Sequence, residues 1–280
     1  MRSSDAGLTA RLVLEGRDFE VDLGRPASLA LPLDFAGRGP SWFGAGQPRR
    51  RPYAVGTFSG SVAGGASCNC SVLELVPHCH GTHTECAGHL TSEALDVTAV
   101  APRGLLPALL VSVTPERAAD CGEGSNPAPA AADRLVTSRG LAAAWDAARS
   151  PFRPVALVVR TLPNDAGKRH RDYDREPAAY LSIEAADWLV ERGIRHLVLD
   201  LPSADRAHDG GALSAHRRYF GLPPRSTRLA EVRRPEATLT ELAWIDAAIA
   251  DGCGLLELQL PAFAGDAVPS RPLLYPVRAR

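Results

Sequence analysis

The chain has 280 residues, of which 45% are hydrophobic and 22% charged, the balance of an ordinary globular protein. Its formal net charge is -1, so no overall field selects nucleic acid or an acidic membrane surface. No apolar run approaches the roughly 20 residues of a membrane-spanning helix, and residues 1–7 lack the apolar core of a signal peptide. We therefore expect a cytoplasmic protein with neither nucleic-acid nor membrane partners.

The first elements along the chain are predicted to be strands and loops. Two short apolar stretches, residues 12–14 and 19–23, flank a turn and predict an N-terminal hairpin. Residues 32–52 are rich in glycine, proline and arginine and predict a long loop. Within it, Trp42 and Phe43 either cover an apolar pocket or simply pack the loop against the protein.

Histidines cluster in residues 78–89, directly after an apolar run at 71–76 that predicts a strand. Four of the eight histidines, one glutamate and two cysteines fall in this segment. These side chains bind metals or transfer protons near neutral pH. We expect the preceding strand to give them the rigid support that a metal site needs. Such clustering favours a metal site over coincidence.

The spacing within this segment assigns different roles to its members. On an extended chain His83 and Glu85 point to the same face, where a histidine and a carboxylate form a natural ligand pair for zinc or manganese. His89 can then act beside the metal as general acid and base. His78 and His80 share a face with each other, and only a bend would bring either to the face of His83.

The chain then alternates strands and helices. Strands near residues 237–244 and 254–260 end this series, although Thr238 and Glu241 also fit a helix capping box. Strand–helix–strand order requires crossover connections and some parallel pairing. No linker divides the chain, so we expect one α/β domain over residues 1–280. The earlier predicted strands are 105–113, 155–161 and 196–201, and the helices are 138–149 and 182–192.

Two other places can supply metal ligands. The first is residues 200–205, at the end of a predicted strand, followed by Asp209 and His216, because strand ends in α/β proteins line the ligand crevice. The second is Glu241, whose carboxylate sits in an apolar segment and is costly to bury unless it is paired or metal-bound. A solvent-facing Glu241 is an equally good interpretation.

The six cysteines are expected to be free thiols or metal ligands, because no signal peptide directs the chain to an oxidising compartment. The absence of two Cys-x-x-Cys pairs disfavours a structural zinc ribbon. A cysteine hydrolase, with Cys86 or Cys79 as nucleophile and a nearby histidine as base, is an alternative. No known cysteine-enzyme signature accompanies these residues.

The run from His80 to His89, HGTHTECAGH, resembles the signature of the cyclase-like metal-dependent hydrolases, His-x-Gly-Thr-His-x-Asp-x-Pro-x-His. This family includes bacterial kynurenine formamidase (arylformamidase) and isatin hydrolase. Residues 200–203 with His216, and residues 266–275, are similar as well. The resemblance implies a swivelling β/β/α arrangement around a mixed central sheet and a homodimer or homotetramer. It also divides the domain into an N-terminal hairpin and loops (1–65), a metal-motif region (70–115) and a C-terminal half (150–280).

The resemblance also implies roles for individual residues. His83 and Glu85 would bind zinc or manganese, one or two ions per subunit, and His216 and Glu241 would complete a second metal position. His89 would be the catalytic acid/base.

Three residues depart from the family pattern. Cys79 stands where the family has its first histidine ligand, Glu85 replaces an aspartate, and Ala87 replaces a proline. A thiolate at Cys79 is itself a good zinc ligand. Otherwise His78 takes over its role, or the position binds no metal.

The resulting expectation is a metal-dependent hydrolase of a small amide, formamide or lactam carbon–nitrogen bond. The most specific form is an arylformamidase of tryptophan catabolism, which converts N-formylkynurenine to kynurenine and formate. Water activated by the metal would attack the carbonyl with His89 as general acid/base. Trp42, Phe43 and Ser203 would contact the substrate. The alternatives are an isatin-type or other cyclic amide hydrolase and a non-catalytic metal-binding homologue.

Overall fold

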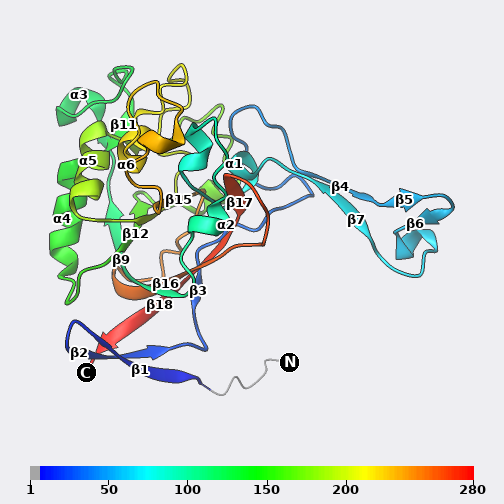
Figure 1. Cartoon of the computed structure of the whole chain (residues 1–280), viewed down its shortest axis with the longest axis horizontal. Helices are drawn as coiled ribbons and strands as arrows, with labels where there is room; N and C mark the ends of the chain where they lie inside the picture. The colour runs from blue at the N-terminus through cyan, green and yellow to red at the C-terminus, as the bar shows by residue number, and fades with distance from the viewer. Residues whose placement is uncertain (1–6) are drawn as a thin grey trace.

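An 11-stranded mixed sheet forms the centre of the protein in the computed structural model, which describes residues 7–280 (Figure 1). Residues 1–6, most of the segment judged to lack a signal peptide, lie outside the described residues. The sheet order is β1-β2-β18-β16-β9-β12-β14-β15-β8-β17, with β3 paired to β18. Its strands are β1 (Thr9–Leu14), β2 (Arg17–Asp22), β3 (Ala27–Ser28), β8 (His83–Glu85), β9 (Leu105–Val113), β12 (Ala156–Thr161), β14 (His196–Leu199), β15 (Thr238–Glu241), β16 (Gly252–Gln259), β17 (Ala267–Pro269) and β18 (Arg271–Ala279).

Four neighbouring strands of this sheet, β9, β12, β14 and β15, run parallel. Helices lie on the connections between them: α4 (Ser138–Ala148), α5 (Ile183–Glu191) and α6 (Ser214–Phe220). The predicted crossover connections and parallel pairing are confirmed, and residues 238–241 form a strand rather than a helix. Because the strands are parallel, their carboxyl ends lie at the same end of the sheet. Strand β8 pairs antiparallel with β15, so the first residue of β8 lies beside the carboxyl end of β15.

The two longest helices begin where the sequence predicts. The Thr137 side chain accepts a hydrogen bond from the Gly140 amide at the start of α4, and Ser182 does the same for Ala185 in α5. Gly193 follows α5 with a φ of +76°, a left-handed conformation that favours glycine.

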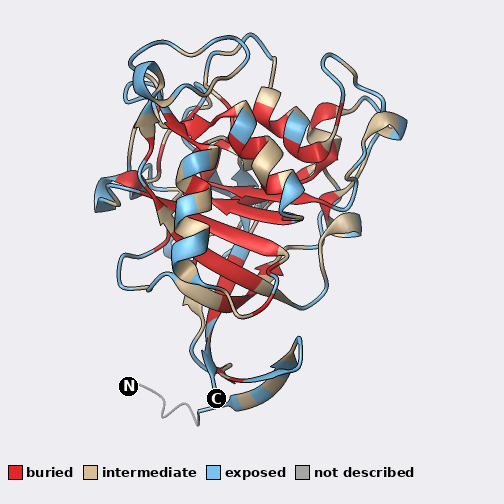
Figure 2. Ribbon diagram, turned by 90° about the vertical axis from the view of Figure 1, so that its left-hand side faces the viewer, coloured by how far each residue is buried: buried red, intermediate tan, exposed pale blue. Residues whose placement is uncertain are grey.

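The core lies on both faces of the parallel strands, which appear as buried ribbons behind the helices in Figure 2. From β12, Leu157 and Val159 pack in a cluster with side chains of α4, α5 and α6. Ala156 and Val158 pack on the opposite face, against Leu29 and side chains of β16 and β18. Burial on both faces explains the continuous apolar sequence of this strand. The expected α/β class with a mixed central sheet is confirmed.

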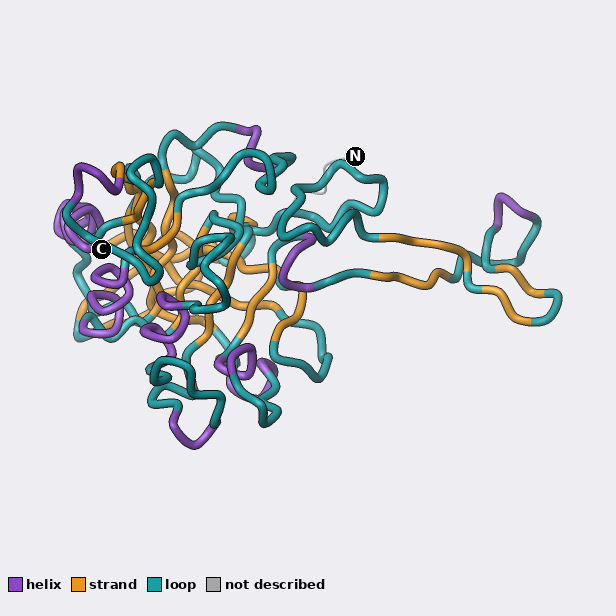
Figure 3. The backbone as a smooth tube through the Cα atoms, turned by 90° about the horizontal axis from the view of Figure 1, so that it is seen from above, coloured by secondary structure: helices purple, strands orange, loops and turns teal. Residues whose placement is uncertain are grey.

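A narrow arm projects from the body of the protein, as Figures 1 and 3 show from two directions. Strand β4 (Arg49–Pro52) pairs with β7 (Ser71–Glu74), and a small hairpin of β5 (Ala54–Val55) and β6 (Phe58–Ser59) lies beyond them. The predicted strand at 71–76 therefore exists, but its expected role as rigid support for the histidines is wrong. Strand β7 is largely exposed and lies outside the central sheet. The predicted loop at 32–52 ends in strand β4.

The remaining elements are short; η1 lies in the arm, and the others lie around the sheet. No helix within residues 7–280 is both long and apolar enough to cross a membrane. A three-stranded sheet consists of β10 (Glu116–Arg117), β11 (Arg134–Val136) and β13 (Tyr180–Leu181). The other helices are α1 (Pro77–His80), α2 (Val97–Val100), α3 (Ala118–Cys121) and the 3-10 turns η1 (Val62–Gly64), η2 (Ala87–Leu90), η3 (Ala166–Arg169) and η4 (Leu229–Glu231).

Folding stability is expected to fall in mild acid because of His196, which is buried at the start of β14 with Nδ1 2.9 Å from Thr238 Oγ1. Burial, helped by Arg195 and Arg234, lowers the pKa of His196 from 6.5 to about 4. The folded pKa lies below the unfolded one, so this contribution is complete above pH 6.5 and is lost as the pH falls towards 4. The loss is about 2 kcal/mol at pH 5.

Urea unfolding of the wild type and His196→Leu at pH 7 and pH 5 checks this expectation. The leucine variant should lose less stability on acidification, by about 2 kcal/mol. Equal losses in the two proteins would show that protonation of His196 is not responsible.

Candidate metal centre

Two antiparallel strands bring acids and histidines together at the carboxyl edge of the parallel strands. In the pairing of β8 with β15, His83 lies opposite Glu241 and Glu85 lies opposite Leu239. His83 and Glu85 are both fully buried, as is expected for alternate residues facing the same side of a strand. His216 approaches them from α6, with Nε2 3.0 Å from Glu85 Oε1. The structure thus brings together four of the five predicted ligands.

Helix α1 supplies the bend that the sequence analysis required for His78. Proline at its first position favours a helical turn directly before β8. The turn places the His78 ring 5.2 Å from that of His83, and His78 Nδ1 lies 3.0 Å from Glu85 Oε2. His80 faces elsewhere, and its Nδ1 accepts a hydrogen bond from the Val76 amide. His78 therefore belongs to the cluster and His80 does not.

Three buried atoms at the centre of the cluster make no hydrogen bond in the described chain, although His78 Nδ1 and His216 Nε2 each lie 3.0 Å from one oxygen of Glu85. His83 Nδ1 lies 3.1 Å from the Gly81 carbonyl oxygen and donates to it, which leaves the lone pair of Nε2 facing the cluster. Within residues 7–280 no hydrogen bond reaches that Nε2 or either carboxylate oxygen of Glu85. Buried polar atoms are rarely left in this state. When His78 and His216 are neutral, their nitrogens and these atoms all converge as acceptors, which fits a divalent cation.

His216 shows the environment typical of a metal-binding histidine. Its Nδ1 lies 2.6 Å from Asp205 Oδ2, and Asp205 also accepts from the backbone amides of Ala215 and His216. A carboxylate on one ring nitrogen orients the other towards a metal. That other nitrogen, Nε2, lies 3.0 Å from Glu85 and 3.5 Å from Glu241.

Glu241 is buried, so the interpretation of a solvent-facing carboxylate is wrong. Its Oε1 accepts a hydrogen bond of 2.6 Å from the Ala204 amide, and its Oε2 lies 3.5 Å from His83 Nε2. The strand β15 carries it to the cluster through its pairing with β8. The carboxylate therefore has one oxygen held by the backbone, and each of its oxygens lies 3.5 Å from a predicted histidine ligand, Oε1 from His216 and Oε2 from His83.

The buried charges shift one another's pKa values in opposite directions. Burial acts to raise the pKa of Glu85, but His89, His216 and His78 hold it well below its usual value. Burial acts to lower the pKa of His216, but Glu85, Glu241 and Asp205 raise it well above the usual value. In the same way Asp266 and Glu85 outweigh burial and raise the pKa of His78 to about 10. A bound cation would replace these protons as the balancing positive charge.

Cys79 lies beside the cluster but outside its groups of converging ligand atoms. It packs with Trp42, Tyr173 and Leu242, and burial raises the pKa of its thiol to about 11. Among the described residues His78, and not Cys79, completes groups whose ligand atoms lie within 4.8 Å of one another. This arrangement favours the alternative in which His78 replaces the family's first histidine.

The thiols also give no support to a cysteine hydrolase. Burial raises the pKa of Cys86 to about 12, and its thiol donates to the Leu95 carbonyl oxygen. Both Cys79 and Cys86 are thus kept protonated, whereas a nucleophilic cysteine needs a thiolate. All six cysteines are free, as expected.

Two carboxylates that contact the histidine cluster are not singled out by the sequence. Asp205 orients His216, and Asp266 lies 3.3 Å from His89 Nδ1 and 3.0 Å from His78 Nε2. Asp205 belongs to the stretch 200–205 that was expected to provide ligands. Asp200 in the same stretch instead binds Lys168 and Thr161 away from the cluster. An acidic residue after a predicted strand indicates a candidate ligand. That pattern fits both Asp200 and Asp205, so it cannot tell which of them contacts the cluster.

A cavity of about 590 Å³ opens onto the cluster. His89 lies on its wall with 27% of its side chain exposed, and Glu85, His216 and Glu241 also line it. The predicted substrate contacts Trp42, Phe43 and Ser203 line the same cavity. Trp42 is buried, whereas Phe43 is 65% exposed at the cavity. The size and mixed lining suit a small organic molecule.

The fold resembles those of several solved structures. A predicted metal-dependent hydrolase from Bacillus stearothermophilus is 16% identical with a TM-score of 0.55, and the match covers 90% of this chain and 98% of that one. An isatin hydrolase bound to the product analogue thioisatinate is 14% identical, with a TM-score of 0.52 and coverage of 91% and 93%. Isatin hydrolase A from Ralstonia solanacearum is 14% identical, with a TM-score of 0.55 and coverage of 90% and 91%.

Sequence comparison gives the family. A search of curated proteins found no match. The Cyclase family model matches residues 22–206, which is more than half of the chain and includes the whole histidine segment. Together with the clustered histidines and acids and the shared fold, this match shows that the chain belongs to the Cyclase family.

Proposed function

We propose that the protein is a metal-dependent hydrolase of a small amide, formamide or lactam carbon–nitrogen bond. The observation that carries the proposal is a set of buried atoms that make no hydrogen bond within residues 7–280, His83 Nε2 and both oxygens of Glu85, beside a cavity that Glu85 lines. The isatin hydrolases among the similar folds support this class of substrate.

The residues divide into cation ligands and a proton carrier. We assign one or two zinc or manganese ions to five residues, His78, His83, Glu85, His216 and Glu241, with His78 in place of Cys79. A divalent cation bound there supplies Lewis acidity, which activates water and polarises a carbonyl group. His89, partly exposed on the cavity wall, takes a proton from the attacking water and returns it to the leaving amine.

N-formylkynurenine, an arylformamide, is our first candidate substrate, and isatin, a lactam, is the second. Both are small aromatic molecules, which suits a cavity with Trp42 and Phe43 in its lining. We further propose that the active species is a homodimer or homotetramer, in line with the family resemblance.

Truncation of Phe43 should weaken substrate binding more than chemistry. Loss of its ring removes about 1 kcal/mol of apolar contact, or roughly a fivefold rise in KM, because only part of this exposed ring can be covered by substrate. Steady-state kinetics of Phe43→Ala on both candidate substrates measure this effect. Phe263→Ala removes a similarly exposed ring outside the cavity lining and should leave KM unchanged. A fall in kcat alone would contradict a binding role for Phe43.

Metal analysis of the purified wild type beside His83→Ala tests the proposal itself. We expect stoichiometric zinc or manganese in the wild type, its loss in the variant, and hydrolysis of N-formylkynurenine or isatin by the wild type alone. Metal without turnover on a panel of amides and lactams would favour the non-catalytic homologue. A wild type that binds no metal even after reconstitution would contradict the proposed mechanism.

A further inference from the structure

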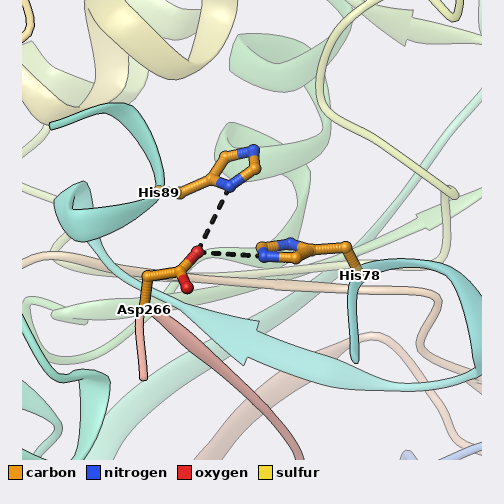
Figure 4. Close-up of side chains that lie close together, drawn as sticks. All are labelled: His78, His89 and Asp266. Atoms are coloured by element: carbon orange, nitrogen blue, oxygen red, sulfur yellow. Dashed lines mark hydrogen bonds and ion pairs between the residues drawn. The ribbon is translucent and has the colours of Figure 1, made fainter. Parts of the chain in front are cut away.

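One carboxylate oxygen contacts two of the histidines that line the cavity. Asp266 Oδ2 lies 3.0 Å from His78 Nε2 and 3.3 Å from His89 Nδ1 (Figure 4). The two rings lie side by side, with centroids 4.2 Å apart and planes 33° apart. A carboxylate oxygen has two lone pairs and can accept both N–H bonds.

The backbone around Asp266 holds this oxygen in place from two sides. The Asp266 carbonyl oxygen accepts from the Cys86 amide at 3.0 Å, and strand β17 begins at the next residue and pairs with β8. On the other side, the Gly265 amide donates to Asp96 Oδ1 at 2.8 Å, and the Gly265 carbonyl oxygen accepts from Val97. The carboxylate therefore rests on the strand that carries His83 and Glu85.

Gly88 allows the close approach of the His89 turn to this carboxylate. A Cβ at position 88 would lie 2.3 Å from the Leu95 carbonyl oxygen and 3.2 Å from Asp266 Cβ. No side chain can occupy that space without displacing backbone. The segment that carries His89 is thus packed directly onto Asp266.

A bond to one ring nitrogen decides what the other nitrogen can do, because a neutral imidazole has one donor and one acceptor. For His78, donation from Nε2 to Asp266 leaves Nδ1 as the acceptor, and Nδ1 is the atom 3.0 Å from Glu85 Oε2. For His89, donation from Nδ1 leaves Nε2 as the acceptor that can take a proton from water. One carboxylate thus fixes which nitrogen of His78 is free to bind a cation and which nitrogen of His89 is free to take a proton.

We propose that Asp266 is a positioning residue that fixes the tautomers of His78 and His89, and this role rests on the hydrolase function proposed above. An asparagine at this position carries no charge and can turn its amide group towards either ring, so it no longer enforces one tautomer. We expect Asp266→Asn to lower kcat by about 100-fold, the lower end of what general acid–base catalysis contributes. KM should change by less than about threefold, because the cavity wall is unaltered.

The experiment compares zinc-loaded wild type with Asp266→Asn, Asp266→Glu and a matched control, Asp120→Asn. Asp120 is exposed on α3, and no hydrogen bond or ion pair of its side chain occurs in residues 7–280. Three quantities are measured: kcat and KM on N-formylkynurenine and isatin, the zinc content, and the histidine tautomers from 15N NMR spectra. Thermal melting confirms that each variant is folded.

The proposal expects Asp266→Asn to keep its zinc, to lose kcat and to show altered tautomer signals for His78 and His89, with partial recovery in Asp266→Glu. A positioning role weakens zinc binding by at most about 100-fold, so failure to bind stoichiometric zinc even at saturating metal would make Asp266 a cation ligand and overturn the positioning role. Unchanged tautomer signals would overturn it as well. A wild type without turnover would count against the hydrolase function, while the tautomer spectra would still decide the role of Asp266.

Discussion

Glu85→Gln is expected to abolish both the stabilisation of the protein by zinc and its activity. Both oxygens of Glu85 are buried, and each lies 3.0 Å from a ring nitrogen of His78 or His216 without a well-formed hydrogen bond. A glutamine has the same size but presents one neutral acceptor and one donor, which repels a cation. In the wild type, zinc at 100 times its Kd should raise the free energy of unfolding by about 2.7 kcal/mol, and the variant should lose this gain.

Thermal unfolding with a chelator and with added zinc measures this difference, and kcat/KM should fall more than about 100-fold in the variant, beyond the loss usual for residues that only support a metal ligand. Glu74→Gln is the matched control, because Glu74 is exposed on the arm strand β7. It should retain the full zinc-dependent rise in Tm. An equal rise in Glu85→Gln would place the cation on other side chains, and the group formed by His78, His89 and Asp266 would be the first to examine.

The candidate site could be predicted from the sequence where its geometry is local. His83 and Glu85 are two residues apart in one strand, so the strand period alone places them together. His78 needed one more piece of information, the helical turn of α1, and Pro77 was a signal for that turn that the sequence analysis did not use. Without the turn, Cys79 and His78 could not be distinguished as the additional ligand.

Contacts between distant strands could not be predicted in this way, although Glu241 was named as a candidate ligand from its apolar surroundings and from the family resemblance. Glu241 reaches His83 only through the pairing of β15 with β8, which are far apart in the chain. Asp266 contacts His78 across 188 residues, and neither periodicity nor spacing carries information at that range. These contacts arise from tertiary packing, which cannot be predicted from the local pattern of a single sequence.

The arm contains a strand that the sequence predicts correctly but whose place in the fold it does not predict. The apolar residues of 71–76 indicate a strand, but they do not indicate whether that strand lies in the core or in an exposed arm. In the structure Leu73 and Val76 are exposed, and β7 pairs only with β4. Strand propensity therefore identified the element, whereas its location depended on the pairing of β4, a strand of three arginines and a proline that carries no apolar signal.

Asp200→Ala is expected to be strongly destabilising although it lies away from the metal centre. Asp200 is fully buried after β14, and Lys168 Nζ lies 2.8 Å from its Oδ2. The amide and hydroxyl of Thr161 also donate to this carboxylate. Removal of the carboxylate leaves the buried Lys168 ammonium without its counter-charge, at a cost of about 3–5 kcal/mol.

Urea unfolding in the presence of a chelator measures this loss without a contribution from metal. Asp187→Ala is the matched control, since Asp187 forms an exposed ion pair of 3.8 Å with Arg218, and it should cost less than about 1 kcal/mol. Replacement of both buried partners, Lys168→Met with Asp200→Leu, should recover much of the loss, because no uncompensated charge remains. If Asp200→Ala and Asp187→Ala were equally mild, the Lys168 ammonium would have to reach water or lose its proton, and the buried pair would not hold the end of β14 in place.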